Sequence, residues 1–355
     1  MRLADGLRLA PAVARSRARG GPPYKLLLSL TDRCTHRCQA CRTWTVAPGD
    51  ELRPTEIATL LGGLPSLRWL DLTGGEIVAR PDAGELAEAV AGQAERLVFL
   101  HFATNGWEPG KVRMFAQGLL RARGPRLVVT VSVDGDEALH DRMRGQPGAF
   151  GRAVETVQAL AGLPHTDVYL GTTLTPLNAP HLDRVGEALA RALPALVPAR
   201  WHVNGMTHSA HFFRNEGVPG LDAADALAAT HAIERLRGRS RDAFALIERV
   251  YLRALRSYLA TGRAPAPCQA LRASVFVGAT GEVHPCHLRG ERLGNVRAAG
   301  LSLPRVLAGP RARALRRRLE REGCAGCWTP CEAYHAIVAA PLRAAARAWV
   351  AEGGL

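Results

Sequence analysis

Apolar and polar positions over residues 24–204 follow an order that predicts a sheet covered by helices. Short apolar runs alternate with longer stretches in which apolar residues recur at helical spacing. The expected strands are residues 24–31, 67–73, 97–104, 126–134, 167–175 and 200–204, and the expected helices are residues 54–61, 81–94, 111–121, 150–161 and 181–193. Strands that alternate with helices in this way are typical of a parallel α/β fold. The pattern alone leaves an open doubly wound sheet and a partial barrel as alternatives.

The rest of the chain divides into shorter segments. Residues 221–261 have a mainly helical pattern with a break near Gly238. Residues 275–277 and 282–284 flank a glycine-containing turn and predict a β-hairpin. We therefore expect a basic N-terminal tail (1–23), an α/β unit (24–204), a helical connector (205–267), a small cysteine-rich domain (268–335) and a C-terminal helix (336–355).

Composition and charge narrow the class of protein. The chain has 355 residues, of which 47% are hydrophobic, and this is enough for one large and one smaller domain. Its net charge is +14, carried almost wholly by arginine because Lys25 and Lys111 are the only lysines. The arginines are scattered along the chain, so nucleic acid is not the expected partner. No run reaches the roughly 18 apolar residues of a membrane helix, and we expect a cytoplasmic protein without membrane attachment.

The eight cysteines fall into two groups at opposite ends of the chain. In a reducing cytoplasm such groups point to metal binding or catalysis before disulfides. The first group is Cys34, Cys38 and Cys41, and the second is Cys268, Cys286, Cys324, Cys327 and Cys331.

The first group has the spacing of an iron–sulfur site with one free position. Three thiolates on one loop can hold three irons of a four-iron cluster and leave the fourth iron for a ligand. Structural clusters and zinc sites take four protein ligands, so a zinc site completed by His36 is the alternative. The loop directly follows the first expected strand, at the strand end where parallel sheets place their active sites.

The next three strands end in polar, glycine-containing motifs at the same edge. These motifs are Gly74-Gly75-Glu76, then Asn105-Gly106, then Ser132 followed by Asp134-Gly135. Paired glycines let another group approach the backbone closely, and Glu76 can accept hydrogen bonds from an ammonium group. Four such strand ends in succession, beginning with the three-cysteine loop, favour a cofactor site at this edge.

The three-cysteine loop followed by a Gly-Gly-Glu motif resembles the signature of the radical S-adenosylmethionine (SAM) superfamily, over residues 24–204. The resemblance implies a partial (β/α)6 barrel of the TIM type and a 4Fe–4S cluster whose fourth iron is chelated by SAM. It implies reductive cleavage of SAM to a 5′-deoxyadenosyl radical that abstracts hydrogen from a substrate. By the same resemblance Gly74, Gly75 and Glu76 hold the SAM amino group, Ser132 and Arg144 its carboxylate or ribose, and Asn105 supports the edge.

One position departs from the family pattern. The residue before the third cysteine is usually aromatic and touches the adenine ring of SAM, but here it is Ala40. Trp44 is the nearby aromatic residue that could replace this contact.

The second cysteine group resembles the SPASM and twitch extensions, which carry auxiliary iron–sulfur clusters. Five cysteines are too few for the two clusters of a full SPASM domain, so we expect one auxiliary 4Fe–4S cluster. The expected ligands are Cys268, Cys286, Cys324 and Cys327, with Cys331 as an alternative ligand or a reactive thiol. A structural zinc ribbon is the alternative interpretation.

Other polar residues follow the sixth strand. His202 and Asn204 at its end, and Arg214 in the next loop, are candidates for substrate contact. The histidines at 208, 211, 284 and 287 are expected to be surface or satisfied core residues, and Phe212 and Phe213 to belong to the core.

Three functions are compatible with these features. The first is oxidation or cross-linking of a peptide or protein side chain, and the second is a twitch-type dehydrogenation of a small molecule such as an aminocyclitol. The third is a non-catalytic iron–sulfur or zinc-stabilised protein, which the free iron position disfavours. The 23 residues before the first strand are too few for a leader-binding domain. Either enzyme requires a reductant of the flavodoxin or ferredoxin type.

Overall fold

A computed structural model describes residues 3–17, 22–122, 124–197, 199–237, 243–324 and 327–339. Nine strands form one sheet in the order β6-β5-β4-β3-β2-β1-β7-β8-β9, and its two edges do not meet. The strands are β1 (Lys25–Ser29), β2 (Trp69–Thr73), β3 (Phe99–Thr104), β4 (Arg126–Ser132), β5 (Thr166–Leu174), β6 (Trp201–Gly205), β7 (Ser274–Val277), β8 (Glu282–His284) and β9 (Gly294–Asn295). Strands β1 to β6 are parallel, which confirms the partial (β/α)6 barrel.

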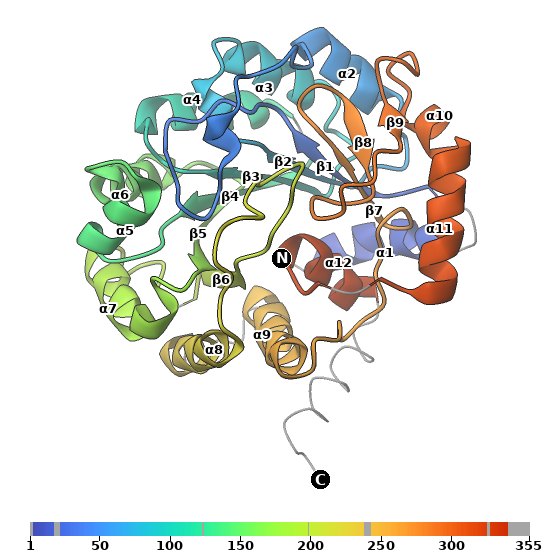
Figure 1. Ribbon diagram of the computed structural model, residues 1–355. Coiled ribbons are helices and arrows are strands. Elements are labelled where there is room, and N and C mark those ends of the chain that lie inside the picture. Colours follow the sequence, from blue (N-terminus) through green and yellow to red (C-terminus); the bar gives the residue numbers. More distant parts are fainter. Residues whose placement is uncertain are drawn as a thin grey trace.

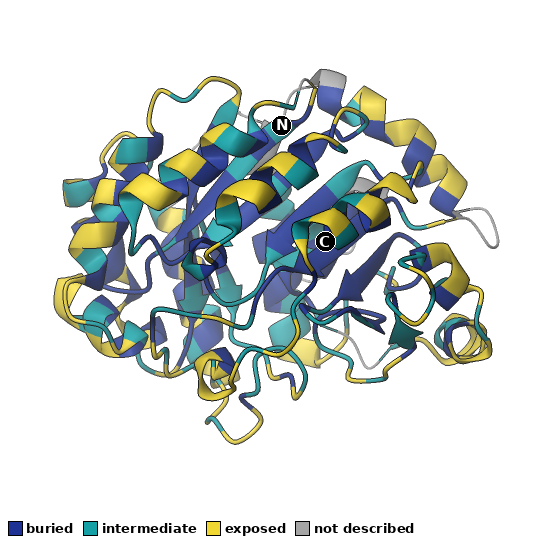
Figure 2. Cartoon of the chain, turned by 90° about the horizontal axis from the view of Figure 1, so that it is seen from above, coloured by how far each residue is buried: buried dark blue, intermediate teal, exposed yellow. Residues whose placement is uncertain are grey.

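Helices connect the parallel strands and cover the outer face of the sheet (Figure 1). They are α2 (Pro54–Gly62), α3 (Ala83–Ala91), α4 (Pro109–Leu119), α5 (Glu137–Arg144), α6 (Ala149–Leu160) and α7 (Leu182–Ala192). All but α5 were expected from the helical spacing. Seen from above, the buried strands lie between helices whose outward residues are exposed (Figure 2).

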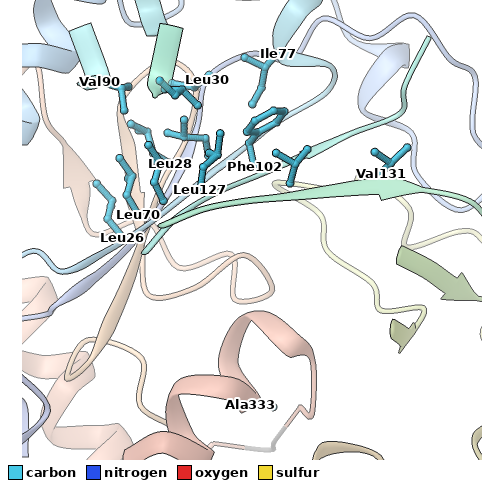
Figure 3. Close-up of a cluster of buried hydrophobic side chains, with 14 of the residues drawn as sticks. Leu26, Leu28, Leu30, Leu70, Ile77, Val90, Phe102, Leu127, Val131 and Ala333 are labelled. Atoms are coloured by element: carbon cyan, nitrogen blue, oxygen red, sulfur yellow. The ribbon is translucent and has the colours of Figure 1, made fainter. Parts of the chain in front are cut away.

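Side chains alternate strictly across the sheet. Leu26, Leu28 and Leu70 point to the helix side, where they join the main apolar core (Figure 3). The positions between them, such as Lys25 and Asp71, face the concave side instead. A strand directs successive side chains to opposite faces, so the inner face collects every second residue. The strands are therefore apolar on the face that meets the helices and partly polar on the concave face.

The C-terminal region continues the same sheet. The predicted hairpin is present as β7 and β8, and β7 also pairs in parallel with β1. Three helices follow: α10 (Leu303–Leu307), α11 (Pro310–Glu322) and α12 (Pro330–Ala339). Figure 1 shows α12 on the concave side, across the sheet from α2, α3 and α4. The sheet thus carries the cysteine-rich segment directly beside the barrel, and α12 begins before the expected C-terminal helix at 336.

Within the expected basic N-terminal tail, residues 3–17 form helix α1 (Leu3–Arg17). Leu9, Ala12 and Val13 recur at helical spacing and are buried in a second apolar cluster with Phe99. Arg8 donates from Nη1 to the carbonyl of Gly124 at 3.1 Å. The sequence did not predict this helix, because its short apolar stripe spans only one face and the surrounding residues include several arginines.

Two helices occupy the expected connector, α8 (Ala223–Arg237) and α9 (Ala243–Thr261). The predicted break at Gly238 lies outside the described residues. Within the described residues, no helix has both the length and the apolar character needed to cross a membrane.

Candidate functional site

Residues 34–41, which we term the cysteine loop, lie directly on the end of β2. A Cβ atom built on Gly75 would stand 2.0 Å from the carbonyl oxygen of Arg33, and one on Gly74 would stand 2.3 Å from that of Thr31. Only glycine permits so close an approach. The glycine pair therefore seats the residues that lead into the cysteine loop.

Glu76 joins the second and third strand ends. Its carboxylate accepts hydrogen bonds from Thr104 Oγ1 at 2.9 Å and from the backbone N–H of Asn105 at 2.6 Å. The side chain is buried, and this burial raises the pKa of Glu76 to about 7 despite both hydrogen bonds. Asn105 in turn donates from Nδ2 to Thr35 Oγ1 at 2.9 Å. Glu76 thus positions Asn105, and Asn105 holds the cysteine loop at Thr35.

Each thiol of the cysteine loop has a polar neighbour. Arg144 Nη1 lies 3.8 Å from the sulfur of Cys38, and Asn105 Nδ2 lies 3.9 Å from that of Cys34. Cys41 lies 3.2 Å from the hydroxyl of Thr43. Burial raises the pKa of Cys34 to about 12, so without metal the thiol keeps its proton at neutral pH. Metal binding at this loop must therefore displace protons.

Both terminal nitrogens of Arg144 have partners, whereas its Nε has none within the described chain. Its Nη2 lies 2.7 Å from the carboxylate of Asp134, and its Nη1 lies on Cys38. The side chain is nearly buried, with 13% of its surface exposed. Ser132, which was expected to act with Arg144, lines the interior of the barrel instead.

Two aromatic side chains flank the cysteine loop. The ring of His36 is fully buried against Trp107, and neither of its nitrogens has a hydrogen-bond partner within the described chain. Burial and the charge of Arg144 lower the pKa of His36 to about 4. Trp44 donates from Nε1 to the carbonyls of Cys38 and Cys41, at 3.2 and 3.0 Å, and is 38% exposed. Its ring therefore stands beside the loop that carries Ala40.

The loop after β6 holds the cysteine loop in place through hydrogen bonds, a role that the sequence analysis did not predict. The N–H of Arg42 donates to the carbonyl of Phe213 at 2.8 Å, and Asn215 Nδ2 donates to the carbonyl of Ala40 at 2.8 Å. Arg214 forms an ion pair with Asp32 at 3.1 Å. No sequence spacing links these segments, because the sheet brings them together. Arg214 thus supports the loop, whereas His202 and Asn204 line the barrel interior.

Four cysteines of the second group surround one cavity. Cys268, Cys286, Cys324 and Cys327, which we term the auxiliary group, line a cavity of about 530 Å³. A hydrogen bond to Cys324, followed by burial, raises the pKa of the Cys268 thiol. Burial also raises the pKa of Cys327 to about 12. Four thiols that line one cavity form a donor set suited to iron.

Cys331 is separated from the auxiliary group. It stands near the start of α12 and lines a second cavity, of about 290 Å³, inside the barrel. Its backbone carbonyl accepts a hydrogen bond from Lys25 Nζ at 2.6 Å. Burial raises the pKa of the Cys331 thiol to about 12 against the lowering effect of Lys25.

This barrel cavity contains a polar ladder that crosses four strands. Lys25 Nζ lies 2.9 Å from the carboxylate of Asp71, whose other oxygen lies 3.3 Å from His101 Nδ1. His101 Nε2 lies 3.0 Å from the hydroxyl of Thr130. Burial alone would raise the pKa of Asp71, but Lys25 and His101 hold it well below its usual range. Asp71 is therefore ionised and fixes the orientation of His101.

The barrel cavity lies between the two cysteine groups. Phe213 lines the cavity, and its carbonyl binds the residue that follows Cys41. On the other side, Cys286 faces the auxiliary cavity while the next residue, His287, faces the barrel cavity. In the same way, Trp328 lines the auxiliary cavity and the next residue, Thr329, lines the barrel cavity.

The thiols of both cysteine groups fit an iron–sulfur cluster, in which each thiolate binds a different iron. The orphaned ring of His36 and the N–H donors on thiol sulfurs also suit a group with acceptor sulfides beside the cysteine loop.

Comparisons with known proteins agree with this reading. A family model described as SPASM, an iron–sulfur cluster-binding domain, matches residues 268–328. The chain is 32% identical over 183 residues to the AdoMet-dependent heme synthase of Methanosarcina barkeri, covering 49% of each chain. It is 26% identical over 146 residues to the antilisterial bacteriocin subtilosin biosynthesis protein AlbA of Bacillus subtilis, covering 39% of this chain and 31% of AlbA. AdoMet is SAM.

Solved structures share the fold at low identity. Native anSMEcpe with bound AdoMet has a TM-score of 0.58 and 12% identity, covering 93% of this chain and 97% of that one. Streptococcus suis SuiB bound to the precursor peptide SuiA has a TM-score of 0.58 and 13% identity, covering 83% of this chain and 66% of SuiB. The chain spans about half the length of the two heme synthases that it matches, 49% and 46%.

Proposed function

Because this chain is a radical SAM protein with a SPASM iron–sulfur domain, we propose that it is an enzyme that oxidises or cross-links a side chain of a peptide or protein. The observation that carries the proposal is the place of the barrel cavity. The barrel cavity lies between the cysteine loop and the auxiliary group. Its lining residue His287 directly follows Cys286 of the auxiliary group in the chain. A substrate in the cavity therefore lies beside the auxiliary cavity, and Phe213 connects the same cavity to the residue after Cys41.

Cys34, Cys38 and Cys41 hold a 4Fe–4S cluster in this proposal, and the auxiliary group holds a second one. When bound, the first cluster and SAM supply a 5′-deoxyadenosyl radical, which removes a hydrogen atom from the substrate. Glu76 accepts a hydrogen bond from the SAM ammonium, since its carboxylate has about four acceptor positions and Thr104, Asn105 and the backbone of Val78 occupy three of them. Gly74 and Gly75 contribute by seating the cysteine loop.

Other residues of the same site have narrower roles. Arg144 orients and neutralises the thiolate of Cys38 through Nη1, while Asp134 holds Nη2. Ser132 faces the substrate side of the site. Trp44 offers its half-exposed ring to adenine in place of the aromatic residue that Ala40 lacks.

His101 is placed to accept a proton from the substrate by way of the Thr130 hydroxyl. Asp71 lies on Nδ1 of His101 and Thr130 on Nε2, and Thr130 lines the barrel cavity, so it connects Nε2 to the substrate. An ionised carboxylate behind an imidazole orients it and stabilises its protonated form. Lys25 is locked by Asp71 and by the carbonyl of Cys331, so it keeps Asp71 charged without reaching the substrate.

The size and chemistry of the barrel cavity suit a single side chain. Its volume of about 290 Å³ is at the lower end of the roughly 300–1,000 Å³ typical of ligand pockets. Trp69, Phe99 and Tyr169 give it apolar walls beside the polar ladder. Two similar proteins point the same way, since AlbA is named for bacteriocin biosynthesis and SuiB was solved with a precursor peptide.

A small molecule is the second candidate substrate. The modest volume of the barrel cavity favours it equally, and the match to two heme synthases is the longest in sequence. In either case the thiols require a reducing compartment, for which we propose the cytoplasm, and an external flavodoxin- or ferredoxin-type reductant.

Hydrogen transfer from the substrate tests the proposal. The anaerobically reconstituted, reduced protein is given SAM with either the peptide fraction or the small-molecule fraction of source cells grown in heavy water. We expect deuterium in 5′-deoxyadenosine with the peptide fraction, and loss of this label after protease treatment. Label that appears only with the small-molecule fraction and resists protease would establish the second candidate. Absence of 5′-deoxyadenosine under every condition would exclude radical chemistry.

A further inference from the structure

Arg289 touches two of the four thiols in the auxiliary group. Its backbone N–H donates to the sulfur of Cys286 at 3.4 Å, and its Nη1 donates to the sulfur of Cys324 at 3.4 Å. These two cysteines are 38 positions apart in the sequence, so one residue links thiols that the chain supplies from different segments. The proposed function assigns no role to this arginine.

An ion-pair network fixes the guanidinium on the thiol. Glu291 accepts from Nε of Arg289 at 3.1 Å and also from its Nη2. Arg318 of α11 donates to the same carboxylate at 2.6 Å. Two arginines share one glutamate, so the triad keeps a net charge of about one positive unit beside Cys324.

The wall of the auxiliary cavity is positive beyond this triad. Arg263, Arg272 and Arg316 line it together with Arg289. Glu320 and Glu332 are the acidic residues of that lining, and Glu332 lies 3.3 Å from His335. Cationic groups thus outnumber anionic ones around the four thiols.

We propose that Arg289 raises the reduction potential of the auxiliary cluster and so biases that cluster toward accepting an electron; this inference rests on the proposed function. Reduction adds a negative charge to the cluster. A nearby positive charge and N–H donors on the ligand sulfurs stabilise the reduced form more than the oxidised form. The guanidinium of Arg289 supplies both effects at Cys324, namely a positive charge and an N–H donor to the sulfur.

The midpoint potential of the auxiliary cluster tests this role directly. The full chain with Cys34→Ala, Cys38→Ala and Cys41→Ala serves as background, so that the auxiliary cluster alone gives an electron paramagnetic resonance signal. In this background we expect Arg289→Gln to lower the potential enough to cut the ratio of reduced to oxidised cluster about tenfold, or about 59 mV. Arg289→Lys, which keeps the charge but not the fork, should fall between Arg289→Gln and the parent chain.

A matched control is Arg292→Gln, three residues further on. Arg292 pairs with Glu282 at 3.5 Å, is 55% exposed and does not line the auxiliary cavity, so its loss should leave the potential unchanged. An unchanged potential in an Arg289→Gln chain with full iron overturns the inference. If Arg289→Gln loses iron, Arg289→Lys decides: a lowered potential supports the inference, whereas an unchanged potential or lost iron overturns it. A parent chain without any auxiliary signal would instead overturn the proposed function.

Discussion

The two cysteine groups have similar surroundings, but the fold brings their thiols together in different ways. The first group lies within one loop at the end of β1 and is seated by backbone contacts to Gly74 and Gly75. The auxiliary group comes from four places between residues 268 and 327 and meets around a cavity that residues 263–272, α11 and α12 help to line. In both, an arginine held by a carboxylate lies on one cysteine sulfur: Arg144 on Cys38, and Arg289 on Cys324.

This difference indicates which properties are local. A contiguous loop keeps its spacing even where the surrounding fold changes, whereas the auxiliary group exists only if the small domain folds correctly. The first site should therefore tolerate damage to the second, while the barrel cavity between them depends on both. The predictions below test that asymmetry, from the largest expected effect to the smallest.

Loss of the auxiliary thiols should stop product formation and leave the first site working. We predict that Cys324→Ala combined with Cys327→Ala gives no product but retains slow cleavage of SAM in the absence of substrate. Chromatography of 5′-deoxyadenosine and of product measures the two reactions, and circular dichroism checks that the barrel stays folded. Cys331→Ala is the control for iron content, which it should leave unchanged because this thiol lines the barrel cavity and not the auxiliary cavity. Full product from a folded double variant would show that the auxiliary group is dispensable.

The polar ladder between the groups should affect the substrate step alone. His101→Gln is expected to slow product formation by about 10²–10⁴-fold, the usual contribution of a positioned proton acceptor. Slow SAM cleavage without substrate should stay close to that of the unsubstituted chain, because His101 lies inside the barrel and away from the cysteine loop. Equal losses in both reactions would mean that His101 supports the fold and accepts no proton.

At the first site, Glu76 should contribute to SAM affinity. Glu76→Gln keeps an acceptor for Asn105 but removes the negative charge, and a hydrogen bond to a charged group contributes about 1.5–3 kcal/mol. The dissociation constant of SAM, measured by calorimetry on the reconstituted protein, should rise by about 10–100-fold. Unchanged SAM affinity in a folded variant would remove Glu76 from the SAM site.

The smallest effect concerns a contact that joins the two regions. Arg297, just after β9, donates to the carboxylate of Glu56 at 2.7 and 2.8 Å and to the carbonyl of Glu51 at 2.9 Å. Glu51 in turn accepts from Thr31 and Asp32, which precede the cysteine loop. The hydrogen bond from Arg297 is the main cause that lowers the pKa of Glu56 to about 2 from its ordinary value of 4.5.

A folded-state pKa below the unfolded value means that ionised Glu56 stabilises the fold above pH 4.5 and that this contribution is lost as the pH falls toward 2. We predict that Glu56→Gln lowers the free energy of unfolding at pH 7 by about 1–2 kcal/mol, as urea unfolding would measure, because the pair is partly exposed. The deficit should shrink below pH 4.5. Glu88→Gln, which breaks the exposed pair with Arg121, should have little effect. A deficit that is constant with pH would contradict this account.

Sequence reasoning succeeded where the signal is contiguous. The six parallel strands and the hairpin come from short apolar runs, and Cys34, Cys38 and Cys41 stand together whatever the fold does around them. It failed where strand register decides the neighbours. Lys25, Asp71 and His101 form a ladder because β1, β2 and β3 lie side by side. The sequence did contain a sign of this ladder, because each of these apolar runs has a polar residue on the face opposite the apolar core. Such a pattern is typical of strands that line a cavity.

Two further features depend on contacts that no spacing reveals. The loop around Phe213 and Asn215 reaches the cysteine loop across more than 170 positions. Cys331 is only four positions from Cys327, yet the turn before α12 directs it into the barrel cavity. Short sequence distance between cysteines was therefore a poor guide to which of them share a site.

The iron content of the chain tests the central claim, that two separate clusters flank one cavity. The account predicts about eight irons per anaerobically reconstituted chain, and about four in the variant with Cys34→Ala, Cys38→Ala and Cys41→Ala, which should cleave no SAM. Elemental analysis and Mössbauer spectroscopy of the two proteins provide both numbers. About four irons together with one zinc in the unsubstituted chain, or SAM cleavage by the triple variant, would contradict the account.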